Sequence, residues 1–107
     1  MARLIVMMKK NSVKLVDLKG PVTRIGRDLT SDVQIEQPQI SRHHAEVVLE
    51  DGNASVRDMG SVNGTYVNGQ KVTAQELHHG DVLRFGDCDM RFLSQGTAKP
   101  AQSLSLA

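Results

Sequence analysis

Short runs of alternating apolar and polar residues recur along most of the chain, and turn-forming residues separate them. The alternation is clear at Val13-Lys14-Leu15, at Val33-Gln34-Ile35 and at Leu83-Arg84-Phe85. Because successive side chains of a strand point to opposite faces, a period of two indicates strands with one buried face. No stretch of about eleven residues or more keeps a helical period instead. The chain is therefore predicted to be built from short β-strands.

Turn-forming pairs set the spacing of these strands. The pairs are Gly20-Pro21, Asp51-Gly52, Asn63-Gly64, Asn68-Gly69, Gly80-Asp81 and Gly86-Asp87. Asn-Gly and Asp-Gly favour tight hairpins, since both central residues must adopt a positive φ. Many short strands at this spacing are typical of a β-sandwich or barrel. Residues 74–79 are long enough for one helical turn and no more, and we expect strands at 3–8, 12–18, 22–25, 33–35, 44–50, 54–58, 65–67, 71–73, 82–85 and 89–94.

Length, composition and charge indicate one ordinary globular domain. The 107 residues are 39% hydrophobic and 23% charged, which fits a single core and excludes a disordered chain. A formal net charge of +1 gives no reason to expect nucleic acid as a partner. The apolar run from Leu4 to Met8 is too short for a membrane span or a signal-peptide core. We therefore expect no membrane partner and a cytoplasmic location.

The single cysteine and the composition of the last residues bear on the setting of this domain. Cys88 excludes an internal disulfide and a cysteine-only metal site. From Gln95 to Ala107 the chain turns to Gly, Thr, Ala, Lys, Pro, Gln and Ser. We expect one domain over 1–94 and a flexible tail or linker over 95–107. Such a linker would join the domain to other domains of a longer parent chain.

Three loop runs combine small or turn-forming residues with hydrogen-bond donors. They are Gly26-Arg27, Ser41-Arg42-His43-His44 and Ser61-Val62-Asn63-Gly64-Thr65. Arg, Ser and Asn side chains suit a phosphate group or a peptide backbone, and loops on a rigid sheet usually carry binding residues. Each run alone is better explained as a turn, because one exposed charge pair contributes only ~0–1 kcal/mol. Phosphate binding would require the three loops to converge.

The ordered combination of these runs resembles the forkhead-associated (FHA) domain family. The matching residues are Gly26, Arg27, Ser41, Arg42, His44, Ala45, Asn63, Gly64, Thr65, Asn68 and Gly69, with similar strand signatures at 32–35 and 80–86. The resemblance covers about residues 4–94. It implies an all-β fold, an eleven-stranded β-sandwich of two twisted sheets whose loops converge at one end. It also implies a non-catalytic module that binds phosphothreonine in a partner protein or peptide in Ser/Thr-kinase signalling, with no cofactor.

The resemblance also implies a role for each matching loop residue. Arg27 would contact the phosphate with its guanidinium, Ser41 would donate its hydroxyl, and Arg42 would add side-chain or backbone donors. Asn63 would hold the main chain of the ligand. The residues that would support the loop shapes are Gly26, His44, Gly64, Thr65 and Asn68.

Val62 departs from the usual family pattern, which often has Ser or Thr at this position. Valine has no side-chain donor, although its backbone N–H could still serve the phosphate. We keep Val62 in the expected phosphopeptide-binding set. Its presence also leaves open an alternative, in which the FHA fold is a phosphate-independent scaffold or oligomerisation domain.

Metal-dependent and hydrolytic chemistry find little support in the chain. His43 and His44 would point to opposite faces of a strand, and His78 and His79 precede a Gly-Asp turn. A metal site requires three or four convergent ligands. A triad built on Ser41 lacks the Gly-x-Ser-x-Gly elbow. We therefore expect neither a metal site nor catalytic residues, and no enzyme activity.

The few aromatic residues raise the question of what fills the core. Tyr66, Phe85 and Phe92 are the only aromatic residues of the chain. We expect methionines to fill the remaining space, namely Met7, Met8, Met59 and Met90. Cys88 is expected to be incidental within a Gly-Asp-Cys-Asp turn.

Overall fold

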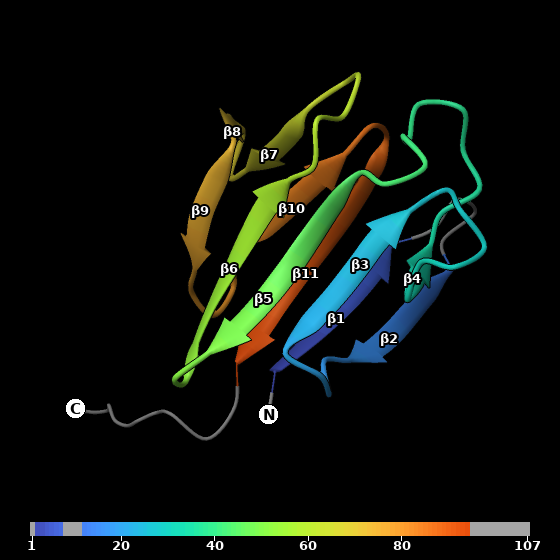
Figure 1. The fold of residues 1–107 in the computed structure, drawn as a ribbon. Helices are drawn as coiled ribbons and strands as arrows, with labels where there is room; N and C mark the ends of the chain where they lie inside the picture. Colours follow the sequence, from blue (N-terminus) through green and yellow to red (C-terminus); the bar gives the residue numbers. More distant parts are fainter. Residues whose placement is uncertain (1, 8–11, 95–107) are drawn as a thin grey trace.

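The computed structural model describes residues 2–7 and 12–94 and arranges them in two facing β-sheets (Figure 1). Its eleven strands are β1 (Ala2–Met7), β2 (Val13–Asp17), β3 (Val22–Gly26), β4 (Val33–Gln34), β5 (Ala45–Glu50), β6 (Asn53–Asp58), β7 (Thr65–Val67), β8 (Gln70–Val72), β9 (Ala74–Leu77), β10 (Val82–Phe85) and β11 (Cys88–Ser94). These described residues contain no helix that could cross a membrane. The predicted eleven-stranded β-sandwich is confirmed.

The two sheets differ in size. One has six strands in the order β2-β1-β11-β10-β7-β8, and the other has five in the order β4-β3-β5-β6-β9. Neighbouring strands run antiparallel except β3 and β4, which are parallel over Ile25↔Val33 and Gly26↔Gln34. Ala2 pairs with Ser94 at the end of the sandwich where the described chain begins and stops. The β3–β4, β4–β5 and β6–β7 loops gather at the opposite end (Figure 1).

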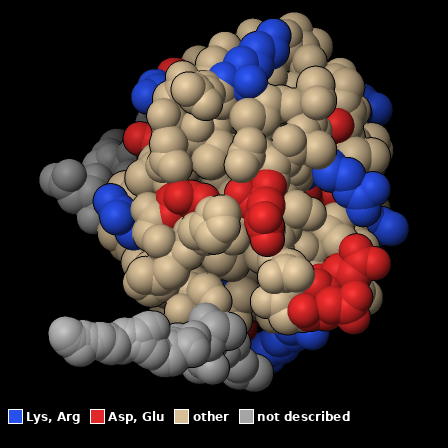
Figure 2. Space-filling model, turned by 90° about the vertical axis from the view of Figure 1, so that its left-hand side faces the viewer, with Lys and Arg blue, Asp and Glu red and all other residues tan. Residues whose placement is uncertain are grey.

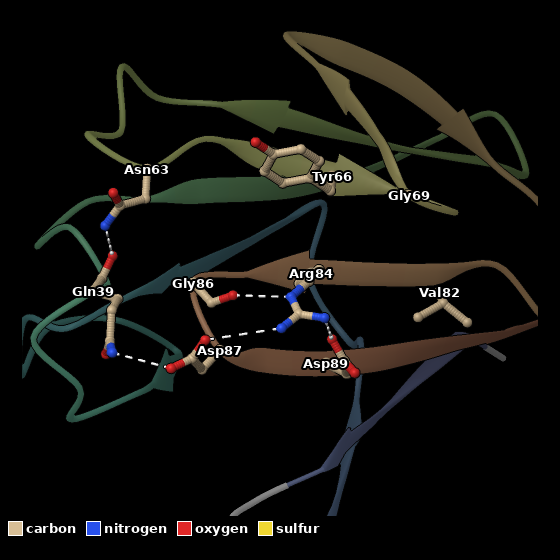
Figure 3. A pocket seen from close by; sticks show the side chains of 9 residues that line it. All are labelled: Gln39, Asn63, Tyr66, Gly69, Val82, Arg84, Gly86, Asp87 and Asp89. Atoms are coloured by element: carbon tan, nitrogen blue, oxygen red, sulfur yellow. Dashed lines mark hydrogen bonds and ion pairs between the residues drawn. The ribbon is translucent and has the colours of Figure 1, made fainter.

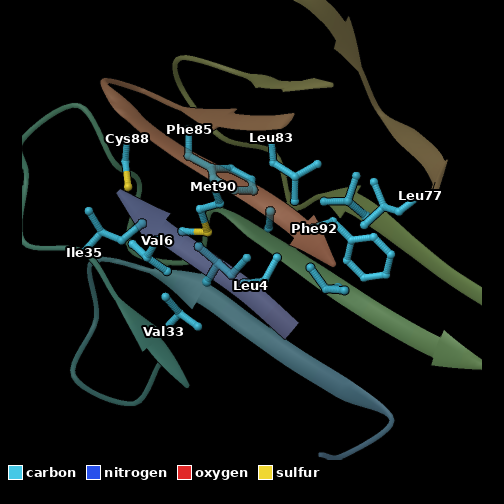
Figure 4. Packing of buried hydrophobic residues seen from close by; sticks show 14 of the residues in the cluster. Leu4, Val6, Val33, Ile35, Leu77, Leu83, Phe85, Cys88, Met90 and Phe92 are labelled. Atoms are coloured by element: carbon cyan, nitrogen blue, oxygen red, sulfur yellow. The ribbon is translucent and has the colours of Figure 1, made fainter. Parts of the chain in front are cut away.

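The alternation along the strands places one apolar row of each sheet in the core. On β10, Leu83 and Phe85 are fully buried while Arg84 between them is exposed. Leu4 and Phe92, which face each other across β1 and β11, are also buried (Figure 4). Each such side chain contributes about 1.5–3 kcal/mol when it is fully buried. The core therefore fixes the strand ends from which the loops project.

The helical turn considered for residues 74–79 does not form. Residues Ala74–Leu77 form β9, the edge strand of the five-stranded sheet, paired with β6 from Ala54↔Leu77 to Arg57↔Ala74. A helical segment this short is unstable alone, since the first turn fixes many dihedral angles for one hydrogen bond. Pairing with β6 instead satisfies the backbone and buries Leu77 to 5% exposure.

Some core predictions were also wrong. Met90 is fully buried as expected, but Met7 and Met59 are 37% and 45% exposed. Cys88 is not incidental, because it begins β11 and is only 2% exposed. The turn at Gly86 and Asp87 pairs Phe85 with Cys88, and this register places the thiol in the inward row with Met90. Met8 and the expected tail at 95–107 lie outside the described residues.

Candidate functional site

The end of β3 and the loop before β5 are joined through their backbones. The Arg27 N–H donates to the Ser41 carbonyl at 3.0 Å, and the Asp28 N–H donates to the Arg42 carbonyl at 3.3 Å. This close approach requires Gly26, since a Cβ there would lie 1.9 Å from the Arg42 carbonyl oxygen. The absence of a side chain at Gly26 thus allows the Gly26-Arg27 and Ser41-Arg42 segments to lie against each other.

His44 joins the second loop to the third. The Ser41 N–H donates to its Nδ1 at 3.1 Å, so the proton must sit on Nε2, which lies 2.8 Å from the Gly64 carbonyl and donates to it. The imidazole is fully buried and meets the Phe85 ring edge-on, with centroids 5.5 Å apart. His43, the next residue back, has a side chain that is 68% exposed. The two histidines therefore face opposite sides, and only His44 connects the loops.

The Asp58 carboxylate holds the β6–β7 loop through four hydrogen bonds. Its Oδ2 accepts the N–H groups of Gly60 and Ser61 at 3.2 and 3.1 Å, and its Oδ1 accepts the hydroxyls of Ser61 and Thr65. Burial alone would raise the pKa of the Asp58 carboxyl, but these hydrogen bonds together hold that pKa below its usual value. The Ser61 hydroxyl in turn accepts the Gly64 N–H at 2.9 Å. The loop is thus pinned on both sides of its tip.

Where these loops meet, they enclose a pocket of about 290 Å³. Its lining residues are Arg27, Pro38, Gln39, Ile40, Ser41, Arg42, Val62 and Asn63. All five residues expected to bind a phosphopeptide are in this set. The described lining carries two arginines and no acidic side chain, so its electrostatic field favours an anion.

Hydrogen bonds within the pocket orient its donors. Arg27 Nε donates to the Ile40 carbonyl at 3.0 Å, which leaves the terminal guanidinium nitrogens to face a ligand. The Val62 N–H donates to Ser41 Oγ at 3.0 Å. Because this oxygen is the acceptor in that bond, the Ser41 hydroxyl keeps its own proton for another partner.

A larger pocket of about 620 Å³ adjoins this one on the outer face of the six-stranded sheet (Figure 3). Its lining residues are Gln39, Asn63, Tyr66, Gly69, Val82, Arg84, Gly86, Asp87 and Asp89. Gln39 and Asn63 belong to both pockets, and Asn63 Nδ2 donates to the Gln39 carbonyl at 2.8 Å. Arg84 lies 3.8 Å from a carboxylate oxygen of Asp87 and of Asp89. The two pockets therefore adjoin each other, with Asn63 and Gln39 in the lining of both.

Of the residues expected to support the loops, Gly26, His44, Gly64 and Thr65 adjoin the smaller pocket without being part of its lining. Thr65 and His44 are fully buried, whereas Gly64 has a φ of 90° that the bend after Asn63 requires. Asn68 lies elsewhere: its side chain joins the β7–β8 turn to the start of β10, donating to Asp81 and accepting from Val82.

Sequence reasoning missed two residues of this site. Asp58 has a local signal, since aspartate two residues before glycine often accepts backbone N–H groups in an Asx turn. Gln39 carries no such signal, because it reaches Asn63 and Asp87 only through the fold. Within residues 2–7 and 12–94 there is no group of three or more His, Cys, Asp or Glu side chains that could hold a metal ion.

The remaining surface is less distinctive. Figure 2 shows the side of the molecule on which β9 lies, where acidic and basic side chains are interspersed among larger uncharged areas. No single sign of charge dominates this face, in contrast to the two arginines gathered in the loop pocket.

The fold and the pocket define a small β-sandwich binding module that carries its site on loops at one end. The FHA domain family matches residues 23–86, and the chain belongs to this family. It is 40% identical over 88 residues to the ABC transporter ATP-binding/permease protein Rv1747 of Mycobacterium tuberculosis, covering 82% of this chain and 10% of that protein. It is 39% identical over 93 residues to the glycogen accumulation regulator GarA of Mycolicibacterium smegmatis, covering 87% of this chain and 59% of that protein.

Solved structures agree with this assignment. One from a structural and functional analysis of phosphothreonine-dependent FHA domain interactions superposes with a TM-score of 0.80 and 26% identity. The match covers 88% of this chain and 98% of that chain. The chain thus matches nearly all of that solved chain, but only about a tenth to three fifths of the two curated relatives.

Proposed function

We propose that this domain is a non-catalytic interaction module that binds phosphothreonine-containing partner proteins in Ser/Thr-kinase signalling. The observation that carries the proposal is the pocket in which Arg27 of the β3–β4 loop meets Ser41 and Arg42 of the β4–β5 loop. Two relatives support the proposal. One is the solved structure from the analysis of phosphothreonine-dependent FHA domain interactions, and the other is the glycogen accumulation regulator GarA. No acid–base pair or nucleophile is needed for this role.

Each donor has a distinct part in the proposed complex. The terminal nitrogens of Arg27 bind phosphate oxygens, because its Nε is already held by the Ile40 carbonyl. The Ser41 hydroxyl donates to the phosphate while its oxygen accepts the Val62 N–H. Val62 therefore acts on the phosphate through Ser41, and its backbone N–H is not itself the ligand donor.

The magnitudes suit reversible signalling. A phosphothreonine brings roughly −1.5 to −2 charges and three strong acceptor oxygens. Charge-assisted hydrogen bonds contribute about 1.5–3 kcal/mol net each, and association itself costs several kcal/mol. An affinity on the order of micromolar, about −8 kcal/mol, is therefore expected.

A peptide fits the site better than free phosphate does. Asn63 stands between the two pockets, its amide nitrogen on Gln39 and its amide oxygen turned away from that bond (Figure 3). A ligand main chain held by Asn63 continues from the phosphate pocket into the larger pocket. The partner is thus an extended phosphopeptide segment of a protein.

The setting of the module belongs to the same proposal. We take residues 1–94 as the domain and 95–107 as a linker to other domains of a longer chain. The module works in the cytoplasm, where Ser/Thr kinases act, and needs neither nucleic acid nor membrane as a partner. Both curated relatives extend well beyond the matched region, which supports a modular arrangement.

Titration of a phosphothreonine peptide and its unphosphorylated form tests the proposal. Arg27→Ala is expected to weaken phosphopeptide binding about 10- to 100-fold, equivalent to one charge-assisted contact. Asn63→Ala is expected to weaken it as well. Arg91→Ala is the matched control, since Arg91 is exposed on β11 and lies outside both pockets. If neither pocket variant weakens binding, the proposed site is wrong.

A second candidate function, a phosphate-independent scaffold or oligomerisation domain, has its own observation. The edge strand β2 exposes Val13 and Leu15 to 65% and 53%. Edge strands with apolar side chains readily pair with another chain. Light scattering of the wild type and of Leu15→Lys tests it: a dimer that this substitution dissociates, with binding that survives phosphatase treatment, would favour the scaffold.

A further inference from the structure

Val62 is an apolar residue in an unusual place. Its residue surface is 86% exposed, the highest value among the exposed large hydrophobic residues of the described chain. It nevertheless lines the pocket in which the phosphate-binding donors meet. Leu29, on the β3–β4 loop, is 82% exposed but does not line that pocket. Both residues are exposed, but of the two only Val62 lines the pocket.

The β6–β7 loop holds Val62 outward on a fixed backbone. On one side, Asp58 binds the N–H and the hydroxyl of Ser61. The N–H of Val62 itself donates to Ser41 Oγ, and on the other side Asn63 Nδ2 donates to the Gln39 carbonyl. With each residue of the tip anchored, the isopropyl group cannot turn back into the core. It stays in water until a ligand covers it.

The position of Val62 also limits which part of a ligand can reach it. Its N–H lies 3.0 Å from the Ser41 oxygen, the group assigned to the phosphate in the proposed function. An extended peptide advances about 3.3 Å per residue. The side chains that can cover Val62 are therefore those within about two residues of the phosphothreonine.

We propose that the Val62 side chain selects partner segments with an aliphatic side chain within two residues of the phosphothreonine. This inference rests on the proposed function and specifies its ligand. Burying a methyl or methylene group contributes about 0.8 kcal/mol, so an aliphatic side chain on Val62 strengthens binding about fourfold to tenfold over alanine. Serine or threonine at this position would offer a hydroxyl and less apolar surface. Compared with serine or threonine, Val62 therefore presents the ligand with an apolar surface in place of a hydroxyl.

The test uses fluorescence anisotropy with a phosphothreonine peptide in an alanine background. Isoleucine is placed singly at each of the two positions on either side of the phosphothreonine. Wild type is expected to gain fourfold to tenfold at one position. Val62→Thr, which keeps the β-branched shape, is expected to lose that gain, measured within the variant as the ratio of its affinities for the isoleucine and the all-alanine phosphopeptides. Leu29→Thr, the equally exposed control, is expected to keep the gain.

Three results would overturn the inference. One is no gain for isoleucine at any position in the wild type, and another is a gain that persists in Val62→Thr. The third is an equal loss in Val62→Thr for every phosphopeptide, with the alanine one included, which would place Val62 on the threonine methyl. Failure of the proposed function is distinct, because phosphorylated and unphosphorylated peptides would then bind alike whatever their flanking residues.

Discussion

Asp58 holds the tip of the binding loop, and Asp58→Asn removes half of its accepting capacity with almost no change in shape. The carboxylate accepts two N–H groups through one oxygen and two hydroxyls through the other. Asparagine keeps a single accepting oxygen and presents an NH₂ group to the other pair of donors. Two hydrogen bonds to a charged group are lost, each contributing about 1.5–3 kcal/mol. Since the site is partly solvated, we expect a destabilisation of about 2–4 kcal/mol.

Two measurements test the effect of losing these hydrogen bonds in Asp58→Asn. Thermal unfolding is expected to show a Tm lower by about 8–32 °C, because a domain of this size loses about 4–8 °C per kcal/mol. Titration with a phosphothreonine peptide below the new Tm is expected to show weaker binding, since Ser61 and Val62 are no longer pinned beside Ser41. Asp51→Asn is the control: Asp51 is exposed at a φ of 53°, which asparagine tolerates.

The pH dependence supplies a second test of the same carboxylate. Its folded pKa lies below the ordinary value of 3.8, so its stabilisation is present above about pH 4 and is lost as the pH falls through the folded pKa. Asp58→Asn should therefore flatten the acid limb of the stability profile. If Asp58→Asn unfolds at the same temperature as wild type and binds phosphopeptide equally well, the loop is not held by this carboxylate.

A substitution at Gly26 and the alkylation of Cys88 test the packing of the domain. Gly26→Ala is expected to destabilise the domain by about 2–4 kcal/mol in denaturant titration, because its Cβ would lie 1.9 Å from the Arg42 carbonyl oxygen. Gly20→Ala, whose Cβ would meet nothing closer than 3.9 Å, should change little. Burial and then the nearby Asp89 charge raise the pKa of the Cys88 thiol to about 11. Alkylation at pH 8 is therefore expected to be at least about 100-fold slower in the native protein than in urea, and equal rates would contradict the buried position.

Much of the fold can be predicted from local sequence patterns. Leu83 and Phe85 alternate with Arg84, and burial alternates with them. The hairpin at Asn68-Gly69 has φ values of 50° and 85°, as an Asn-Gly pair indicates. Other features are not local. Residues 74–77 become a strand only because β6 offers its edge, and Cys88 turns inward only because the β10–β11 register pairs it with Phe85.

The candidate site divides in the same way. Interactions between near neighbours in the chain establish the strand period, the turn positions and the kinds of donor that the loops carry. The meeting of those donors comes from packing between distant segments: Val62 reaches Ser41 across 21 positions, and Asn63 reaches Gln39 across 24. Such contacts form because the buried His44 and the bare backbone at Gly26 hold the loops together. The same packing leaves Val62 in water at the mouth of the pocket, which no local pattern foretells.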